Sequence, residues 1–139
     1  MTPGKDYIGV GCGLLVVNDK QEVLLMLRNA SIRNDRNLWS QPGGAVEFGE
    51  TIEQAIKREA VEEIGVEVEL LELLNVNDHM IDGAHWIAPA YLCRIISGEL
   101  KNMEPEKCEE IRWFSLSALP ENLNENTKNS TTVLKRRAT

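Results

Sequence analysis

The stretch QPGGAVEFGETIEQAIKREAVEEIGV, residues Gln41 to Val66, decides the fold. Its second half predicts a helix from Ile52 to Ile64. Thr51 and Gln54 have the spacing of a capping box, which would begin that helix. Gly65 stands where a helix commonly ends on a left-handed glycine. One helix, with both of its ends, is therefore predicted from local sequence, directly after a loop that contains two adjacent glycines.

Three carboxylates gather on this helix: Glu59, Glu62 and Glu63. At about 100° per residue they fall in one sector about 100° wide, where like charges repel. One interpretation is a solvated acidic face. The other is a site for a hard divalent cation, because Mg²⁺ and Mn²⁺ take carboxylate and other oxygen ligands. Gly43 and Gly44 could bring backbone carbonyls to such an ion, since glycine tolerates unusual dihedrals.

One arginine lies among these acidic residues. Arg58 is eight residues after Glu50 and adjacent in sequence to Glu59. A guanidinium at that place could neutralise Glu50 across the junction of loop and helix. We therefore predict an ion pair that holds the loop in place.

From Gly44 to Val66 the chain resembles the Nudix hydrolase signature, G-x5-E-x7-R-E-U-x-E-E-x-G-U, where U is a bulky aliphatic residue. The matching residues are Gly44, Glu50, Arg58, Glu59, Glu62, Glu63, Gly65 and Val66. Ala60 at the first U position is a mild departure that leaves every polar position intact. The resemblance implies an α/β protein, a Nudix-type α/β/α sandwich with a mixed sheet, over residues 1–139 as one domain.

The resemblance also implies roles in catalysis. Glu59, Glu62 and Glu63 would be the ligands of Mg²⁺, with Mn²⁺ as a substitute, and the Gly44 carbonyl would be an extra ligand. Glu59 or Glu62 would orient or deprotonate the attacking water, with Arg58 and Glu50 completing the catalytic set. The activity implied is Mg²⁺-dependent cleavage of a nucleoside diphosphate linked to another group, with a nucleoside triphosphate as the leading substrate, giving a monophosphate and pyrophosphate.

Residues 102–114 are similar to a MutT-like subgroup of nucleoside triphosphate diphosphatases, which implies further contacts with substrate. Arg28 matches a position that often contacts phosphate. Gly43, in the loop that also contains Gly44, is likewise expected to bind substrate. Glu106 and Glu109 are candidates for a glutamate from a later loop, with solvated surface residues as the alternative. Trp39 could stack on a base or lie in the core. Gln41 departs from relatives, which usually carry an apolar residue there.

The rest of the chain predicts a series of strands. Residues 7–17 and 22–28 are predicted to form a hairpin, and Gly9, Gly11 and Gly13 leave one face of the first strand bare. Residues 29–40 are predicted to be a loop. Further strands are expected at 66–70, 85–96 and 110–114, with Pro89 indicating an edge or a bulge. A short helix is expected to begin near residue 115, and residues 122–139 form a loose tail or a helix.

Composition excludes several classes of function. The formal net charge of −7 argues against a general nucleic-acid-binding surface, so we expect a small nucleotide or diphosphate as partner, and no nucleic acid. Cys12, Cys93 and Cys108 form no Cys-x-x-Cys pair, which indicates reduced, buried thiols. No apolar run is long enough to span a membrane. We therefore expect a cytoplasmic protein, and the sequence allows a homodimer.

Two alternatives to a triphosphatase remain open at this stage. The substrate could be another diphosphate, such as a nucleotide sugar, ADP-ribose or a prenyl diphosphate. The ADP-ribose pattern of the family has a proline about 15 residues beyond the signature, where this chain has Asp82 and Gly83 and no proline before Pro89. The other alternative is a domain that binds a nucleotide without cleaving it, although such domains often lose signature glutamates and this chain has lost none. His79 and His85 are too isolated to indicate a metal site.

Overall fold

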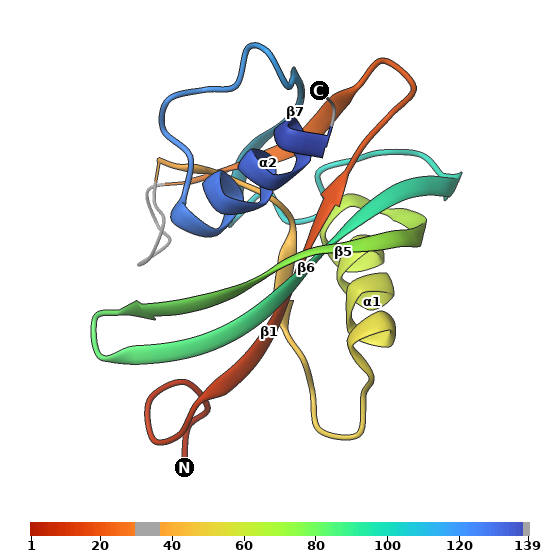
Figure 1. Ribbon diagram of the computed structural model, residues 1–139. Helices are drawn as coiled ribbons and strands as arrows, with labels where there is room; N and C mark the ends of the chain where they lie inside the picture. Colours follow the sequence, from red (N-terminus) through yellow and green to blue (C-terminus); the bar gives the residue numbers. More distant parts are fainter. Residues whose placement is uncertain (30–36, 138–139) are drawn as a thin grey trace.

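The computed structural model describes residues 1–29 and 37–137 (Figure 1). The strands are β1 (Gly9–Val16), β2 (Glu22–Arg28), β3 (Trp39–Ser40), β4 (Gly43–Ala45), β5 (Val66–Ile81), β6 (Ala84–Gly98) and β7 (Cys108–Ser115). The helices are α1 (Ile52–Ile64) and α2 (Glu125–Arg137). The strands form a four-stranded sheet in the order β4-β1-β6-β5 and a three-stranded sheet in the order β3-β2-β7.

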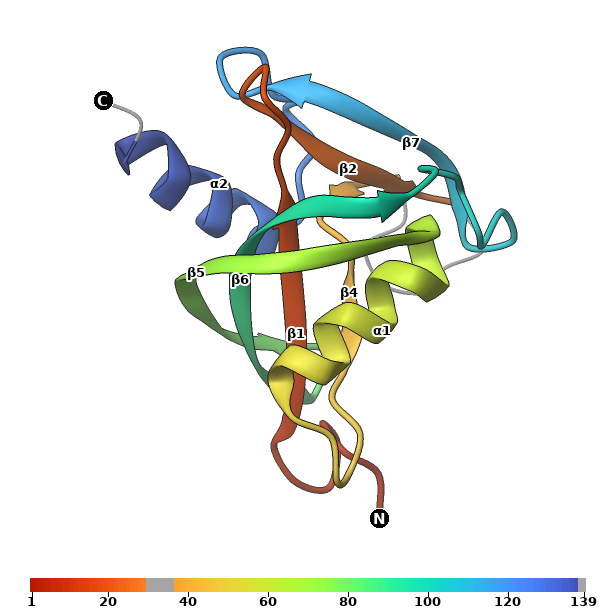
Figure 2. The same ribbon diagram turned by 90° about the vertical axis from the view of Figure 1, so that its right-hand side faces the viewer.

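The four-stranded sheet is mixed, because β1 pairs in parallel with β6 while its other pairs are antiparallel. The two helices lie on opposite sides of the strands, and the long β5–β6 hairpin projects away from the body (Figures 1 and 2). α1 packs on β1, β4 and β5, and α2 packs on β5 and β3. The α/β/α sandwich expected from the sequence is therefore confirmed.

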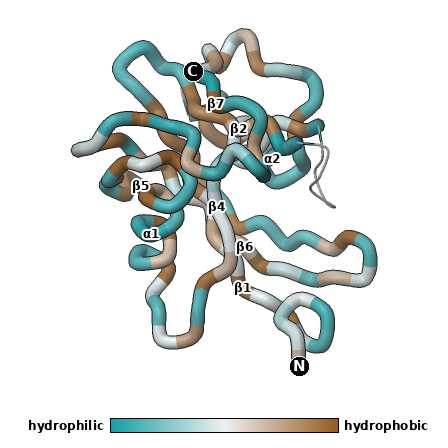
Figure 3. Tube along the Cα trace, turned by 180° about the vertical axis from the view of Figure 1, so that it is seen from behind, coloured by the Kyte–Doolittle hydropathy of each residue, from teal (hydrophilic) through white to brown (hydrophobic). Residues whose placement is uncertain are grey.

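Two hydrophobic cores lie on the two sides of β1 and β2. Leu14 and Leu24 face the first core, which α1 covers, while Leu15 and Leu25 face the second core under α2. All four side chains are fully buried. Strands buried on both faces are near-continuous apolar runs rather than alternating ones, which explains the sequences of β1 and β2. Hydrophilic residues lie on the outer turns of α1 and in the connections (Figure 3).

Both predicted ends of α1 are confirmed. The Thr51 side chain accepts a hydrogen bond from the Gln54 backbone N–H, and the Gln54 side chain accepts one from the Thr51 backbone N–H. Gly65 ends the helix in the left-handed region at φ 72°. One stripe of α1 is buried in the first core, so the opposite stripes are left for polar contacts.

The predicted hairpin of the first two strands is wrong. β1 and β2 belong to different sheets and share only the isolated bridge between Val17 and Val23. The reason is that the backbone of β1 pairs with β4 and β6 instead. The Leu14 N–H also donates to the carbonyl of Pro42, just before β4, at 3.0 Å. The expected loop at 29–40 also contains a short strand, β3, whose Trp39 pairs with Leu27 of β2; residues 30–36 lie outside the described part.

The later strands and the C-terminal segment differ from expectation as well. β5 continues to Ile81 instead of ending at Leu70, since it pairs along its whole length with β6. Pro89 lies in a central strand, at a place where assigned pairing between β1 and β6 is interrupted after Val10 and resumes at Gly13. Residues 116–123 form turns and bends rather than the start of a helix, whereas most of the tail forms α2, the helical alternative of the two expected.

No helix in residues 1–29 and 37–137 has the length and apolar character needed to cross a membrane. All three cysteines are buried and unpaired, as the sequence indicated. Burial raises the pKa of the Cys12 thiol to about 11 and that of Cys93 to about 12. These thiols therefore stay protonated near neutral pH, and a thiolate nucleophile in either position is disfavoured.

Candidate functional site

Arg58 binds four groups at the junction of the loop and α1. It donates two hydrogen bonds to the Glu50 carboxylate, from Nε at 2.7 Å and from Nη2 at 2.9 Å. Nη1 donates to Glu59 at 2.8 Å and to Glu62 at 3.2 Å, and Nη2 also donates to the Ala45 carbonyl at 3.0 Å. The ion pair predicted between Arg58 and Glu50 is present, and its two-pronged geometry fixes the loop against the helix.

This ion pair makes stability depend on pH. The Arg58 guanidinium, assisted by the Glu47 backbone N–H, lowers the pKa of Glu50 from 4.5 to about 2. A carboxylate with a depressed folded-state pKa stabilises the fold above its unfolded-state pKa, and this contribution is lost as pH falls through the folded-state pKa. We expect Glu50→Gln to melt below wild type at pH 6, with a difference that shrinks as pH falls from about 4.5 toward about 2.

Thermal melts at a series of pH values check this expectation. Glu53→Gln is the matched control, because it removes a carboxylate of α1 that pairs with Lys57 instead of Arg58. A difference between Glu50→Gln and wild type that is the same at pH 6 and pH 2.5 would show that Arg58 does not act through the charge of Glu50.

Two other carboxyl groups of α1 meet beside the glycine loop. The Glu59 and Glu63 carboxyls are near enough that each influences the pKa of the other. The Gly43 backbone N–H donates to Glu63 Oε1 at 2.8 Å, and Arg28 Nη2 lies 3.5 Å from Glu63 Oε2. A Cβ on Gly44 would lie 2.5 Å from Glu59 Oε1. Glycine at this position therefore allows the Glu59 carboxylate to come close to the loop backbone.

Burial sets the protonation of this pair. It raises the pKa of Glu63 to about 8, against the lowering effects of the Arg28 charge and the Gly43 N–H, while the nearby Glu59 raises it further. Burial also raises the pKa of Glu59, against the hydrogen bond from Arg58. Two neighbouring carboxyls disfavour each other's charged form, and a bound cation would relieve this repulsion.

The donor set fits a hard divalent cation. Glu59 and Glu63 supply neighbouring carboxylate oxygens, and the missing side chain of Gly44 lets the Glu59 carboxylate lie close to the loop backbone. Glu62 lies apart from this pair: its side chain is 52% exposed and is bound by Arg58. Within residues 1–29 and 37–137 no three His, Cys, Asp or Glu side chains form a ready-made ligand set. The three predicted ligands are therefore on one part of α1, but Glu62 does not point to the same place as Glu59 and Glu63.

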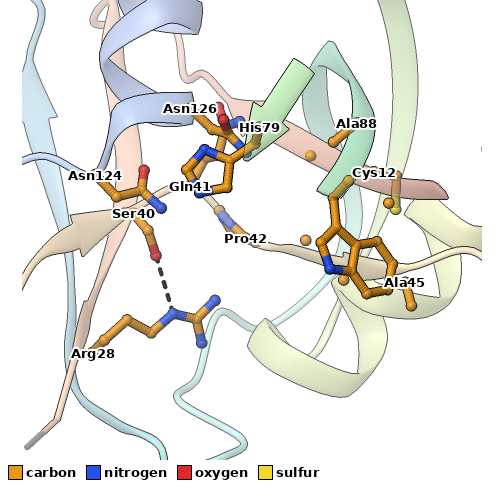
Figure 4. A pocket seen from close by; sticks show the side chains of 15 residues that line it. Cys12, Arg28, Ser40, Gln41, Pro42, Ala45, His79, Ala88, Asn124 and Asn126 are labelled. Atoms are coloured by element: carbon orange, nitrogen blue, oxygen red, sulfur yellow. Dashed lines mark hydrogen bonds between the residues drawn. The ribbon is translucent and has the colours of Figure 1, made fainter. Parts of the chain in front are cut away.

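A cavity of about 460 Å³ opens beside this pair. Its wall includes Gly43 and Gly44 of the loop and Arg28 at the end of β2. Arg28 Nε donates to Ser40 Oγ at 3.1 Å, which aims the guanidinium along the cavity edge (Figure 4). The Arg28 guanidinium and the carboxyls of Glu59 and Glu63 lie at one edge of the cavity. A diphosphate and its metal ions could bind at such an edge.

The family of the chain follows from comparison with known proteins. The family model of the NUDIX domain matches residues 8–135. The chain belongs to the Nudix hydrolase family. The signature residues Gly44, Glu50, Arg58 and Glu59 are thus those that the structure brings together around the glycine loop, and the family expected from the sequence is confirmed.

Several relatives are similar over most of this Nudix chain. The mouse 8-oxo-dGDP phosphatase NUDT18 is 36% identical over 109 residues, which are 77% of this chain and 32% of that protein. The NAD-capped RNA hydrolase NudC of Pseudomonas aeruginosa is 36% identical over 107 residues, 77% of this chain and 36% of that protein. The chain spans about a third of the length of these curated relatives.

A solved structure covers the Nudix chain more completely. The MutT NUDIX hydrolase from Burkholderia pseudomallei is 37% identical, with a TM-score of 0.87, and the match covers 93% of this chain and 99% of that one. This agreement extends beyond the signature to the two sheets and both helices.

Trp39 lies in the second core, which is the alternative to base stacking that the sequence left open. Its residue is 6% exposed, its ring meets the Phe114 ring edge-on at 4.8 Å, and the Arg112 guanidinium lies 5.1 Å from its centroid. Trp39 does not line the cavity. Its neighbours from β7 and from the segment before α2 are distant in sequence, so the loop around it did not reveal them.

The other candidates have mixed outcomes. Glu106 and Glu109 are exposed, at the turn before β7 and at its start, and neither lines the cavity. The Glu106 carbonyl accepts a hydrogen bond from Asn29, so this turn lies beside the end of β2 that carries Arg28. A contact of Glu106 or Glu109 with substrate stays a prediction. His79 lines the cavity, whereas His85 Nε2 pairs with Asp78 at 2.7 Å.

Two cavity residues, Asn124 and Asn126, were missed because the sequence did not indicate where the tail or helix of residues 122–139 packs. Asn124 Oδ1 accepts a hydrogen bond from the Thr127 backbone N–H at 3.0 Å, as an N-cap residue does. An asparagine three residues before Thr127 was the available signal for the start of α2. Its place beside β3 and β4 depends on contacts across more than 80 residues of sequence, such as the bond from Gln41 N to Thr127 Oγ1 at 2.8 Å.

Proposed function

We propose that this protein is a Mg²⁺-dependent pyrophosphohydrolase of nucleoside diphosphate derivatives, with a nucleoside triphosphate as its substrate and a monophosphate and pyrophosphate as its products. The observation that carries the proposal is that Glu59 and Glu63 both lie against the Gly43–Gly44 loop, next to a cavity that Arg28 borders. Nudix hydrolases generally use a divalent metal, and Mg²⁺ fits the oxygen ligands present.

The residues of the site have separable roles in this reaction. Glu59, Glu62 and Glu63 would hold the cation, with the Gly44 carbonyl beside them. A bound divalent cation neutralises phosphate charge and lowers the pKa of its water. Arg28 would hold a phosphate oxygen while Glu63 and Ser40 hold Arg28. Water attacks one phosphorus, the bond to the bridging oxygen breaks, and the released proton passes to a carboxylate of the site or to solvent.

Arg58 and Glu50 act on positions rather than on substrate. Their two-pronged pair keeps the loop 45–50 on α1, and the Arg58 bonds to Glu59 and Glu62 fix two carboxylates at once. Positioning and electrostatics provide most of the rate acceleration in phosphoryl transfer. A small shift of this arginine should therefore cost activity without unfolding the protein.

A panel assay tests the proposal. The protein is incubated with Mg²⁺ and with nucleoside triphosphates, nucleotide sugars, ADP-ribose and a prenyl diphosphate, and products are identified by mass spectrometry. We expect a monophosphate and pyrophosphate from at least one triphosphate, and no product after chelation. Zn²⁺ is not expected to be the natural ion, because no Cys and His ligand set is found in the described residues. Hydrolysis of none of these compounds would contradict the proposal.

A second substrate class is favoured by the similarity to NudC, which is an NAD-capped RNA hydrolase. NAD⁺ and an NAD-capped oligonucleotide therefore belong in the same panel. Faster turnover of these than of any triphosphate would replace the leading substrate and would contradict the expectation that the protein acts on no nucleic acid. The expected homodimer and the expected cytoplasmic location stay predictions, as does a single domain over residues 1–139.

A further inference from the structure

The four-stranded sheet has a face that α1 covers only in part. On β1, Cys12 and Leu14 face the core under α1, and strand alternation places Val10 on the same side. On β5, Val66 and Val68 belong to that core, at the end of the strand that lies under the helix. The sheet continues past α1 into the projecting hairpin (Figure 1). The uncovered part of this face therefore lies on the hairpin and on the start of β1.

Strand register shows which hairpin side chains share this face. Ala88 of β6 lies on the cavity side, beside Gly11 of β1. Its neighbours along the strand, Ile87 and Pro89, therefore point to the opposite side. Val76 of β5 pairs in register with Pro89, and cross-strand partners lie on the same face of a sheet. Val76 is thus on the side of α1, beyond the end of the helix.

Two further side chains of β5 lie on the same side. Met80 pairs with His85, which is two residues from Ile87 along β6. Leu73 pairs with Tyr91, whose side chain packs against the core under α1. Leu73 and Met80 therefore flank Val76 on one face of the hairpin.

Five apolar side chains on this face, called here the hairpin face, are open to solvent. Each is between 44% and 72% exposed; they are Ile8, which alternation places beside Val10, and Val10, Leu73, Val76 and Met80. At about 120 Å² of apolar area for a fully exposed aliphatic side chain, they present roughly 300 Å². A small specific interface of about 600 Å² per partner is about 57% apolar and needs roughly 340 Å² from each side. The hairpin face provides an area of that size.

The charge of the chain favours this face for contact with a second copy. The formal net charge of −7 makes two copies repel each other wherever acidic surfaces meet. On the hairpin face, Asp78 is paired with His85, whose Nε2 lies 2.7 Å from Asp78 Oδ1. The outer side of α1 instead presents charged residues such as Glu53 and Lys57. A second copy therefore meets less repulsion on the hairpin face than on the helix.

The order of side chains along β5 suits a two-fold arrangement. Val76 lies between Leu73 and Met80, about 10–13 Å from each at about 3.3 Å per residue. A two-fold axis at Val76 places Met80 of one copy near Leu73 of the other and brings the two Val76 side chains together. In such an isologous contact, both copies use the same surface.

We propose that two copies of this chain form a two-fold dimer through the hairpin face, with Val76 at the axis. The opposite side of the same hairpin carries Trp86 and His79 of the cavity wall. The dimer contact therefore supports this wall from its outer side. The proposal concerns assembly and goes beyond the proposed function, on which it does not depend.

Sedimentation equilibrium at about 100 μM tests the proposal, since interfaces of ordinary size have a Kd in the micromolar range or below. Wild type is expected at twice the monomer mass. Val76→Lys is expected at the monomer mass, because it brings two like charges together in an apolar contact. Val76 is exposed in the single chain, so circular dichroism should show an unchanged fold. Met80→Lys, at the most exposed position of the face, should have the same effect.

Val61→Lys is the matched control. Val61 is an equally exposed valine, but it lies on α1, outside the hairpin face. The substitution adds the same charge to the chain. Val61→Lys is therefore expected to remain a dimer.

A mixing experiment tests the position of the axis. Val76→Lys and Val76→Glu are each expected to be monomeric alone, because each brings like charges together. An equimolar mixture of the two should form a heterodimer, since the two-fold axis then brings lysine and glutamate together.

Four results would overturn the proposal. They are a wild type at the monomer mass, a Val76→Lys variant that remains a dimer, an equal dissociation of Val61→Lys, and a mixture of the lysine and glutamate variants that stays monomeric. A monomeric wild type would leave the hairpin face to a partner other than a second copy. The proposed function fails differently, through the absence of Mg²⁺-dependent hydrolysis in the substrate panel, so the two proposals can be judged separately.

Discussion

Glu62→Gln is expected to lower kcat by at least about 10²-fold at fixed Mg²⁺, about 2.7 kcal/mol of transition-state stabilisation. The substitution keeps the shape of the side chain and removes one charge from the set that would hold the cation. Glu62 is half-exposed and its one described bond comes from Arg58, so the fold should not change. Steady-state kinetics, with circular dichroism to check folding, measure the effect.

Glu53→Gln is the control for this prediction. Glu53 is on the same helix and pairs with Lys57 at 3.0 Å on a solvated stripe. Loss of a charge there should leave kcat within about twofold of wild type, because surface pairs contribute little. Near wild-type turnover in Glu62→Gln, or an equal loss in Glu53→Gln, would return the acidic helix to the solvated-face interpretation.

Mg²⁺ is expected to raise the melting temperature by several degrees. A ligand that binds only the folded state stabilises it by mass action, about 2.7 kcal/mol at 100-fold excess over Kd, and for a domain of this size that is a shift of several degrees. The variant with Glu59, Glu62 and Glu63 all replaced by glutamine should melt above wild type without metal, because the buried carboxyls no longer compete for charge. It should not respond to Mg²⁺.

Differential scanning fluorimetry with MgCl₂ and with NaCl at equal ionic strength separates binding from screening. A solvated acidic face would respond similarly to both salts. If NaCl reproduces the effect of MgCl₂, or if the triple variant still responds, these carboxylates do not form the metal site.

The helix and its ends could be predicted from sequence because their causes are local. The capping box at Thr51 and the left-handed Gly65 depend on residues within a few positions. The pairing of Arg58 with Glu50 could also be predicted, since the two residues are only eight positions apart and most of that separation is predicted helix. The hairpin of β1 and β2 was not, because residues that are buried on both faces give no signal of which sheet each strand joins.

The substrate side of the site depended on contacts that sequence spacing does not encode. Trp39 precedes the glycine loop, but Phe114 and the segment before α2 enclose it. Asn124 and Asn126 reach the cavity because α2 folds back on β5 and β3. The candidate metal ligands lie within one continuous signature, whereas the rest of the cavity lining comes from β1, β2, β5, β6, the segment at residues 40–43 and the start of α2.

The cavity has two walls of different origin, and this has a consequence for how the protein could diverge. One wall includes the glycine loop, which packs against α1, and the other includes the start of α2 with Gln41 and His79 of β5. Arg58 binds Glu59 and the Ala45 carbonyl, and Glu63 binds Gly43 of the loop, so substitutions near Asn124 and Asn126 need not disturb these three residues. Duplicated copies of such a gene could exchange one ligand for another by changes in the second wall alone, while selection keeps the first wall constant.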